Sequence, residues 1–182
     1  DLLVFSLFDT PYHGVNLFLK RMEDIIISSI ILILSSPLLL FASIGIKITS
    51  PGSIFFKQWR YGLNGKPIEV IKFRTMNVEE NGFVFHQVQK NDKRITPFGR
   101  FLRRTSIDEL PQLFNVLRGE MSMIGPRPHA ISMVEEYRKL FPGSMLRHMI
   151  KPGITGLAQI YGTRGPIDDP NLMKERVKYD KE

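Results

Sequence analysis

The sequence predicts an α+β fold that is mainly helical, built from one membrane helix, a small β-hairpin and a group of helices that carry the candidate catalytic residues. Three observations lead to this prediction. Residues 25–46 form a run of 22 residues without a charged side chain, long enough for a membrane helix. Two short strand-like segments flank an Asn-Gly pair, which is typical of a hairpin. Apolar side chains then recur at helical spacing in the second half of the chain.

The composition describes a basic globular chain without cysteine. The 182 residues carry a formal net charge of +7, and the positive excess lies after the apolar run, where residues 47–182 contain 23 basic and 14 acidic side chains. Such a surface indicates anionic partners: phosphorylated ligands, anionic lipid or nucleic acid. The lack of cysteine excludes disulfides, a thiolate zinc site and a cysteine nucleophile.

The N-terminal part of the chain divides into two segments. Residues 1–19 are interpreted as the remnant of a preceding domain or linker, and residues 20–47 as an amphipathic lead followed by the membrane helix. The apolar run would measure about 33 Å as a helix, enough to cross a bilayer core. Pro37 falls at its middle and removes a backbone hydrogen bond, and Ser35 and Ser36 can satisfy the freed carbonyl groups.

Cations flank the apolar run on both sides, with Lys20 and Arg21 before it and Lys47 after it. Positive flanks prefer the cytosolic side of a membrane, so a helix that enters, bends and returns would satisfy both ends together. These residues alone favour a straight span, and they leave the re-entrant hairpin and a buried core helix as alternatives.

Residues 48–182 are expected to form one domain at the membrane surface. Its expected elements are strands at 53–58 and 68–73 with a turn at Asn64-Gly65, a polar loop at 77–94, a short helix that contains Phe98, Phe101 and Leu102, helices at 107–118 and 131–140, a glycine-rich loop at 151–156 and a helix-like end at 171–182.

The strongest candidate chemistry is the adjacent carboxylate pair Asp108-Glu109, which arginines surround. One interpretation is structural, because Ser106 and Glu109 match a capping box and acids stabilise a first helical turn. The other is catalytic. An ionised aspartate can attack phosphorus, its neighbour can hold Mg²⁺ against diphosphate oxygens, and a helix N-terminus can bind an anion. Pro111 and the nearby Arg103 and Arg104 favour the catalytic interpretation.

Further cations could bind phosphate. Arg127 lies between Pro126 and Pro128, which restrict its backbone and present a rigid bidentate ligand, although a rigid turn with a solvated arginine is the plainer interpretation. Arg147 and Lys151 accompany glycines 153 and 156, which let a backbone approach a ligand, or form an ordinary turn-rich connection. Lys72, taken alone, is a solvated strand cation.

Together these segments resemble the bacterial monotopic phosphoglycosyl transferases, the bacterial sugar transferase family. Within that family the chain is most similar to the undecaprenyl-phosphate glucose phosphotransferase group. The resemblance runs from residue 20 to about residue 179 and rests on these blocks: Lys20-Arg21 with Asp24, Ser36-Pro37, KFRTM (72–76), SIDELPQ (106–112), NVLRGEMSMIGPRP (115–128) and KPGITGLAQ (151–159).

The resemblance implies a fold and an activity. The membrane helix would be re-entrant, kinked at Ser36-Pro37, with a catalytic domain at 48–182 on the cytosolic face of the bacterial inner membrane and its C-terminal end truncated. Asp108 would attack the β-phosphorus of a UDP-sugar, release UMP and pass a sugar-1-phosphate, glucose-1-phosphate by similarity, to undecaprenyl phosphate. This would be the first membrane step of exopolysaccharide, capsule or O-antigen assembly.

The resemblance also assigns residues and partners. Glu109 would hold the cofactor Mg²⁺, and Arg103 would hold phosphate or the geometry of the site. The substrate contacts would be Arg127, Lys72 and Arg147, to which the glycine-rich segment adds Lys151. The implied partners are the UDP-sugar, undecaprenyl phosphate and membrane lipid, with no nucleic acid; the sequence leaves homo-oligomerisation open.

Two departures from the family pattern concern the sugar and a loop: Leu157 stands where tryptophan is common, and Tyr161 precedes glycine where asparagine is common. UDP-galactose or a UDP-N-acetyl sugar is therefore an alternative donor. Two other functions remain as alternatives. One is a membrane-tethered binder of anionic lipid or nucleic acid, and the other is a Mg²⁺-dependent hydrolase of lipid diphosphates that uses the same acids.

Overall fold

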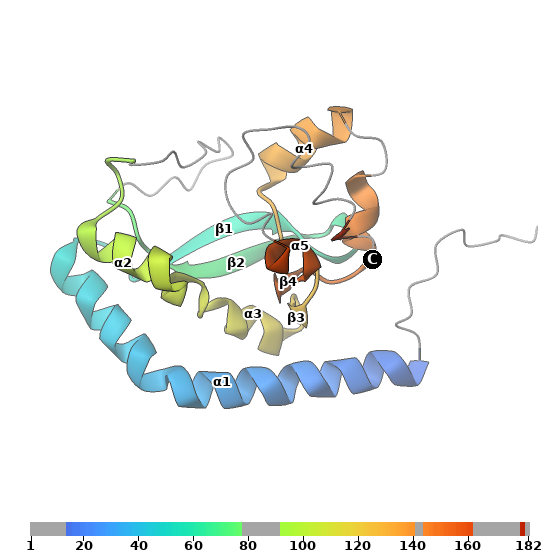
Figure 1. Cartoon of the computed structure of the whole chain (residues 1–182), viewed down its shortest axis with the longest axis horizontal. Helices are drawn as coiled ribbons and strands as arrows, with labels where there is room; N and C mark the ends of the chain where they lie inside the picture. Colours follow the sequence, from blue (N-terminus) through green and yellow to red (C-terminus); the bar gives the residue numbers. More distant parts are fainter. Residues whose placement is uncertain (1–13, 78–91, 141–143, 162–178, 181–182) are drawn as a thin grey trace, which may run out of the picture.

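The computed structural model describes residues 14–77, 92–140, 144–161 and 179–180 (Figure 1). The described part is mainly helical, with one small antiparallel hairpin and one long apolar helix near the N-terminus, which confirms the expected class. Most of the expected remnant at 1–19, of the polar loop at 77–94 and of the helix-like end at 171–182 lies outside the described residues.

Helix α1, Gly14–Thr49, contains the whole apolar run and also the expected amphipathic lead. Within the described ranges it is the one helix long and apolar enough to cross a membrane. Figure 1 shows that α1 bends along its length, and Pro37 lies inside it. Proline cannot donate to the carbonyl four residues earlier, which is that of Ile33. The Ser36 hydroxyl donates to that carbonyl at 2.7 Å, as the sequence predicts.

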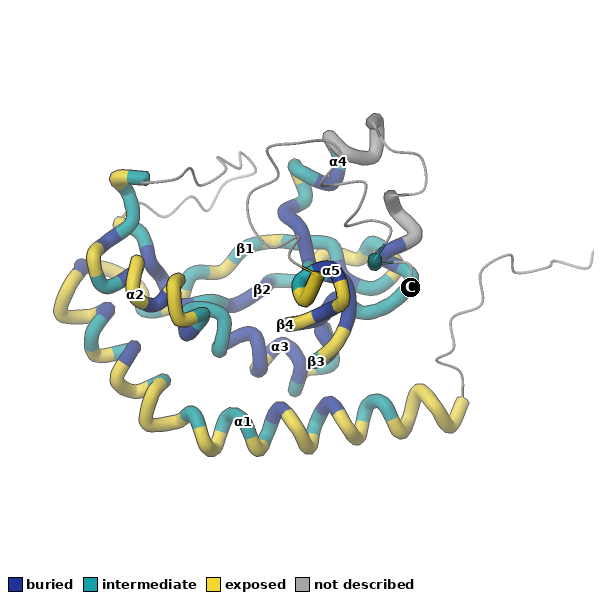
Figure 2. The backbone as a smooth tube through the Cα atoms, viewed as in Figure 1, coloured by how far each residue is buried: buried dark blue, intermediate teal, exposed yellow. Residues whose placement is uncertain are grey.

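Helix α1 has an N-terminal arm before Pro37 and a C-terminal arm after it. Both arms contact the same globular body, while most of the helix between these contacts is exposed (Figure 2). In the N-terminal arm, Arg21 donates to the carbonyls of Val116 and Leu117, both at 2.6 Å. In the C-terminal arm, Ala42 and Ile46 are 0% and 2% exposed in a core cluster. The body therefore lies against the helix at two separated places.

The expected β-hairpin is confirmed. Strand β1, Phe55–Tyr61, pairs antiparallel with β2, Pro67–Phe73. The 3-10 turn η1, Leu63–Gly65, joins them, and its left-handed residue Asn64 has φ 54°. Glycine and asparagine tolerate this conformation best, so the Asn-Gly pair belongs at this position. The buried side of β2 packs against α3 and against the C-terminal arm of α1.

Helix α2, Pro97–Thr105, is the short helix expected around Phe98, Phe101 and Leu102. Thr96 caps it by accepting a hydrogen bond from the Gly99 amide at 2.9 Å, and proline occupies the first turn. The helix ends at Ser106, whose φ of 59° is left-handed.

The single helix expected at 107–118 is wrong. The structure has a 3-10 turn η2, Ile107–Glu109, followed by a separate helix α3, Gln112–Arg118, which ends at Gly119. The capping box is also wrong, because Ser106 makes no side-chain cap and already closes α2 in a left-handed conformation. The two acids thus lie in a tight turn between two helices.

A short parallel pair of strands replaces the expected glycine-rich loop. β3, Ser122–Ile124, pairs with β4, Gly153–Thr155. A Cβ atom on Gly153 or Gly156 would overlap the backbone of Gly125. These glycines therefore allow two protein backbones to pack closely, where the sequence suggested an approach to a ligand. A three-residue strand is too short to give a periodic signal.

The remaining elements cover the hairpin and the β3–β4 pair. Helix α4, Ile131–Leu140, is confirmed, and the bridge between Arg60 and Ala130 ties its start to β1. The 3-10 helix η3, Ser144–Met149, and the short helix α5, Leu157–Ile160, follow.

Candidate active site

The carboxylate pair is held by the buried residues on either side of it. Ile107 is 8% exposed in the core cluster with α1 and α2, and Pro111 is fully buried before α3. Between them, the Glu109 amide donates to the Ser106 carbonyl at 3.2 Å and the Leu110 amide to the Ile107 carbonyl at 3.1 Å. This turn fixes the backbone of both acids.

The Glu109 carboxylate is clamped by two cations. Arg127 donates to it through two nitrogens, Nη1 to Oε2 at 3.1 Å and Nη2 to Oε1 at 2.5 Å. Lys72 donates to Oε1 at 3.1 Å. Burial raises the pKa of Glu109, but the charges of Lys72 and Arg127 and their hydrogen bonds outweigh it and hold that pKa well below its usual range. Glu109 is therefore ionised at any physiological pH.

Distant segments bring these cations together. Lys72 lies on β2, 37 positions before Glu109, and Arg127 follows β3, 18 positions after it. Burial, partly opposed by Glu109 and reinforced by Arg60 and Arg127, lowers the pKa of Lys72 to about 8. Lys72 is thus the group in the cluster whose charge changes near neutral pH.

Asp108 differs from Glu109 in having a carboxylate that no cation holds. It is half-buried, and no hydrogen bond or ion pair joins its carboxylate to another residue in the described ranges. Burial raises the pKa of Asp108, and the charges of Lys72, Arg103 and Arg127 oppose that effect. Its oxygens are therefore available to a ligand in a cationic surrounding.

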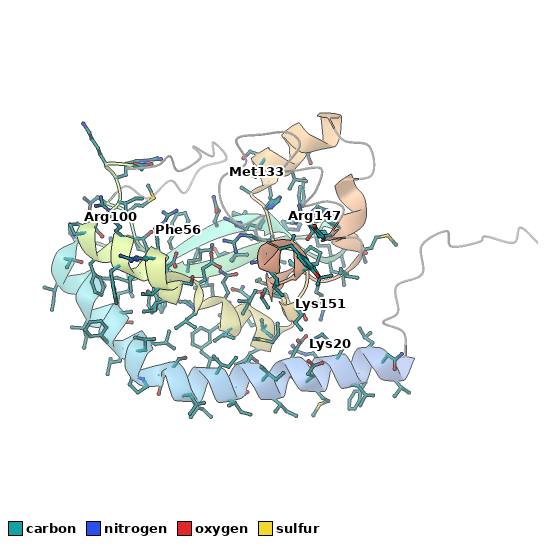
Figure 3. All side chains as sticks on the ribbon, in the orientation of Figure 1. Lys20, Phe56, Arg100, Met133, Arg147 and Lys151 are labelled. Carbon is teal, nitrogen blue, oxygen red and sulfur yellow. The ribbon has the colours of Figure 1, made fainter. Side chains whose placement is uncertain are left out.

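The other predicted site residues lie at different distances from this cluster. Arg103, exposed on α2, is near enough to affect the charge state of Asp108. Arg147 is buried behind Arg127, and its Nη2 donates to the Arg127 carbonyl at 2.7 Å. Lys151 lies beside the N-terminal arm of α1, where Arg21 and Asp24 are its charged neighbours (Figure 3).

Arg60 is a residue near the site that the sequence analysis did not select. It lies on β1, donates to the Pro128 carbonyl, and lowers the pKa of Lys72. Alternation along the strand could have indicated it, because Arg60 shares the inward side of β1 with Phe56 and Gln58 while Phe55, Lys57 and Trp59 are exposed.

A cleft of about 380 Å³ lies between α1 and the carboxylate turn. Glu109 lines it from the carboxylate turn, and Ile31 lines it from α1. The rest of the lining is mainly aliphatic: Leu110, Leu113, Met123, Ile154 and Ile160, with Thr105, Ser106, Thr155 and Gln159. The cleft suits an apolar chain, and its one charged lining residue, Glu109, is the carboxylate that Arg127 and Lys72 hold.

The described acidic residues could bind Mg²⁺ only together with a ligand that supplies further oxygen atoms. Among the described residues no three acidic or histidine side chains gather into a metal site. Mg²⁺ commonly uses one or two carboxylates and takes its other oxygens from substrate phosphates and water. Oε2 of Glu109 accepts a single hydrogen bond, from Arg127, which leaves a lone pair for such an ion.

The profile of the family described as "Bacterial sugar transferase" matches residues 15–182. The chain belongs to the bacterial sugar transferase family. The match includes both carboxylates and every cation of the site described above.

Curated relatives with stated activities resemble the chain over nearly its whole length. The UDP-glucose:undecaprenyl-phosphate glucose-1-phosphate transferases of Klebsiella pneumoniae and Escherichia coli (strain K12) are 58% and 55% identical over 177 and 179 residues. These matches cover 97% and 98% of this chain but 38% and 39% of those proteins.

A more distant relative carries the name of a different sugar. The UDP-N-acetylgalactosamine-undecaprenyl-phosphate N-acetylgalactosaminephosphotransferase of Aeromonas hydrophila is 40% identical over 177 residues, which are 96% of this chain and 41% of that protein. The chain spans about two fifths of the length of these three relatives.

Proposed function

We propose that this chain transfers a sugar-1-phosphate from a UDP-sugar to undecaprenyl phosphate, with Asp108 as a covalent nucleophile. The observation that carries the proposal is the contrast between two adjacent acids. Glu109 is held by Arg127 and Lys72, whereas Asp108, beside it in the same cationic cluster, has no hydrogen-bonded partner among the described residues. A fixed acid beside an uncommitted one suits a division into a positioning group and a nucleophile.

The reaction would take two displacements at one phosphorus atom. A carboxylate oxygen of Asp108 attacks the β-phosphorus of the UDP-sugar, and the bond from that phosphorus to the bridging oxygen breaks, so that UMP leaves with the electron pair. A phosphate oxygen of undecaprenyl phosphate then attacks the same phosphorus. The bond to Asp108 breaks, the free carboxylate returns, and the product is undecaprenyl diphosphate sugar.

The cations of the site would stabilise the negative charge that develops on phosphate oxygens in both displacements. Arg127 is held by Glu109 between two prolines, and Lys72 is held by the same carboxylate, so both are ordered before substrate arrives. Arg103 is exposed on the Asp108 side and can contact the diphosphate. Mg²⁺, held by Glu109 together with diphosphate oxygens, would supply further neutralisation of phosphate charge.

We place α1 in the membrane as a re-entrant helix. The globular body contacts Arg21 in one arm and Ile46 in the other, and a straight span would draw part of that body into the bilayer. The apolar residues between the two arms are exposed, with Ile33 at 71% and Leu34 at 76%. Lipid around the bend would cover them, and the positive flanks would keep both ends on the cytosolic face of the bacterial inner membrane.

The cleft beside α1 supports a lipid acceptor. It runs from α1 to the carboxylate turn, so a prenyl chain could lie along Ile31 while its phosphate lies near Glu109, the neighbour of Asp108 in the chain. Exposed apolar residues of α5, including Ile160 at 71%, extend the same apolar surface. This arrangement would let the lipid react without leaving the membrane.

Glucose is the sugar that two of these relatives support, because the proteins at 58% and 55% identity are named for UDP-glucose. A further relative, the "Exopolysaccharide production protein PSS" of Rhizobium leguminosarum bv. phaseoli, is 48% identical over 172 residues, 91% of this chain and 85% of that protein. Its name supports a role in exopolysaccharide production, and we propose that this role is the first membrane step of exopolysaccharide, capsule or O-antigen assembly.

The test is UMP release by the protein in lipid nanodiscs, with UDP-glucose, UDP-galactose and two UDP-N-acetyl sugars in parallel. The proposal expects turnover that needs both Mg²⁺ and undecaprenyl phosphate, and a lipid product that keeps the sugar. Asp108→Asn should abolish turnover, whereas the matched control Asp92→Asn, at an acid paired with Arg94, should not. A lipid product without sugar would instead identify a hydrolase.

A further inference from the structure

Arg147 and Asp180 form a buried ion pair directly behind the candidate active site. Their side chains are 3% and 2% exposed, and Nη2 of Arg147 lies 2.8 Å from Oδ2 of Asp180. The same guanidinium contacts Nδ1 of His129 at 2.9 Å and donates to the Arg127 carbonyl at 2.7 Å. A guanidinium only donates, so His129 accepts through an unprotonated Nδ1.

These contacts hold the backbone of Arg127 on the side away from Glu109. The backbone carbonyl of Arg127 is fixed by Arg147, and its side chain reaches forward to both oxygens of Glu109. Arg60 holds the next carbonyl, that of Pro128, in the same way. The peptide groups on both sides of Pro128 are thus anchored by the buried Arg147 and the half-buried Arg60, and the direction of the Arg127 side chain follows from the backbone so held.

Burial separates Arg147 from the role of a phosphate ligand. At 4% exposure it offers a diphosphate no open approach, whereas Arg127 faces the carboxylate turn. A buried guanidinium also needs a counter-charge, because an uncompensated charge in the interior is strongly destabilising. Asp180 supplies that charge from the last described segment of the chain, where the neighbouring Tyr179 stacks on Tyr161 with ring centroids 4.9 Å apart.

We propose that Arg147 and Asp180 are a positioning pair that sets Arg127 against Glu109, and that Asp180 thereby supports the catalytic residues. The inference rests on the proposed function, since it assigns Arg127 a role in that reaction. It changes the role expected for Arg147 from substrate contact to positioning residue, and it adds Asp180, which no sequence motif indicated.

The test is a double-mutant cycle on the rate of UMP release. Arg147→Met should lower kcat about 100-fold with less than a threefold change in the KM for UDP-glucose. In an Arg127→Ala background the same substitution should lower the rate less than threefold, because the residue through which it acts is gone. Asp180→Asn should lower kcat about tenfold, and this effect should also vanish in the Arg127→Ala background.

The matched control is Arg74→Met. Arg74 is equally buried and donates to the carbonyls of Ser50 and Pro51, so its loss should change the rate by the same factor in both backgrounds. Equal factors for Arg147→Met in the two backgrounds would overturn the inference, and so would a loss confined to KM. Should Arg147→Met fail to fold, the Asp180→Asn cycle decides alone.

A measurement without turnover separates this inference from the proposed function. The Nε–H resonance of Arg127, assigned by its loss in Arg127→Ala, should move in Asp180→Asn and stay in place in Arg74→Met. An unmoved resonance in Asp180→Asn contradicts the positioning pair. A moved resonance in a protein that releases no UMP from any donor keeps the pair and rejects the proposed reaction.

Discussion

Lys72 should give this protein an alkaline limit of activity near pH 8. Its burial among Arg60 and Arg127 lowers its pKa to about 8, against an ordinary value of 10.5. The lysine is then about 90% protonated at pH 7 and about 10% at pH 9. If the protonated form is needed to hold Glu109 and the diphosphate, kcat/KM for UMP release should fall about tenfold between these two pH values.

Stability should move in the opposite direction in this window. The unfolded chain, with the ordinary pKa, binds the Lys72 proton more tightly than the folded protein does between pH 8 and 10.5, so this group makes the free energy of unfolding rise with pH there. Unfolding therefore does not explain an activity loss caused by Lys72. The assay is kcat/KM for UDP-glucose from pH 6 to 10, with thermal unfolding measured at each pH.

The decisive variant is Lys72→Arg, which stays protonated throughout this range. Its absolute rate will be lower, because guanidinium and ammonium groups differ in shape, but its profile should be flat from pH 7 to 9. A wild-type profile that is flat to pH 10, or an unchanged alkaline limb in Lys72→Arg, would refute the reasoning.

Three further predictions test the supports of the site. Asp24 is 3% exposed and accepts hydrogen bonds from Lys20, Ser122 and Met123; Asp24→Asn should lower stability by about 2–4 kcal/mol in chemical denaturation, and an unchanged midpoint would contradict this. Gly153→Ala should lower the free energy of unfolding by about 1–3 kcal/mol, because the added Cβ overlaps the backbone of Gly125; chemical denaturation measures this too. Ile160→Asp should raise the KM for undecaprenyl phosphate about tenfold through the desolvation of a charge in the cleft, while Ile124→Asp, at another exposed isoleucine that does not line the cleft, should not.

Local chemistry made part of the fold predictable from the sequence. The Asn64-Gly65 turn, the Thr96 cap of α2 and the Ser36 hydroxyl at the proline break each follow from one residue and its near neighbours. The expected kink and the hairpin depend only on such local rules. Ser106 shows their limit, because its place in a capping box was overridden by a left-handed turn that closes the preceding helix.

The assembly of the site could not be predicted in this way. The sequence indicated Lys72, Glu109 and Arg127 separately, but their meeting at one carboxylate depends on β2 and on the loop after β3. Burial is equally a property of the whole fold, so the sequence could not show that Arg147 is buried while Arg127 is partly exposed. Arg147 was for this reason expected at the substrate.

The role of Asp108 as nucleophile is tested most directly by intact mass spectrometry after mixing the protein with UDP-glucose and Mg²⁺ in the absence of lipid acceptor. The account predicts a gain of one hexose phosphate, located on Asp108 by peptide mapping, which disappears on addition of undecaprenyl phosphate and never forms in Asp108→Asn. UMP release at the full rate without any such adduct, or an adduct that persists in Asp108→Asn, would contradict it.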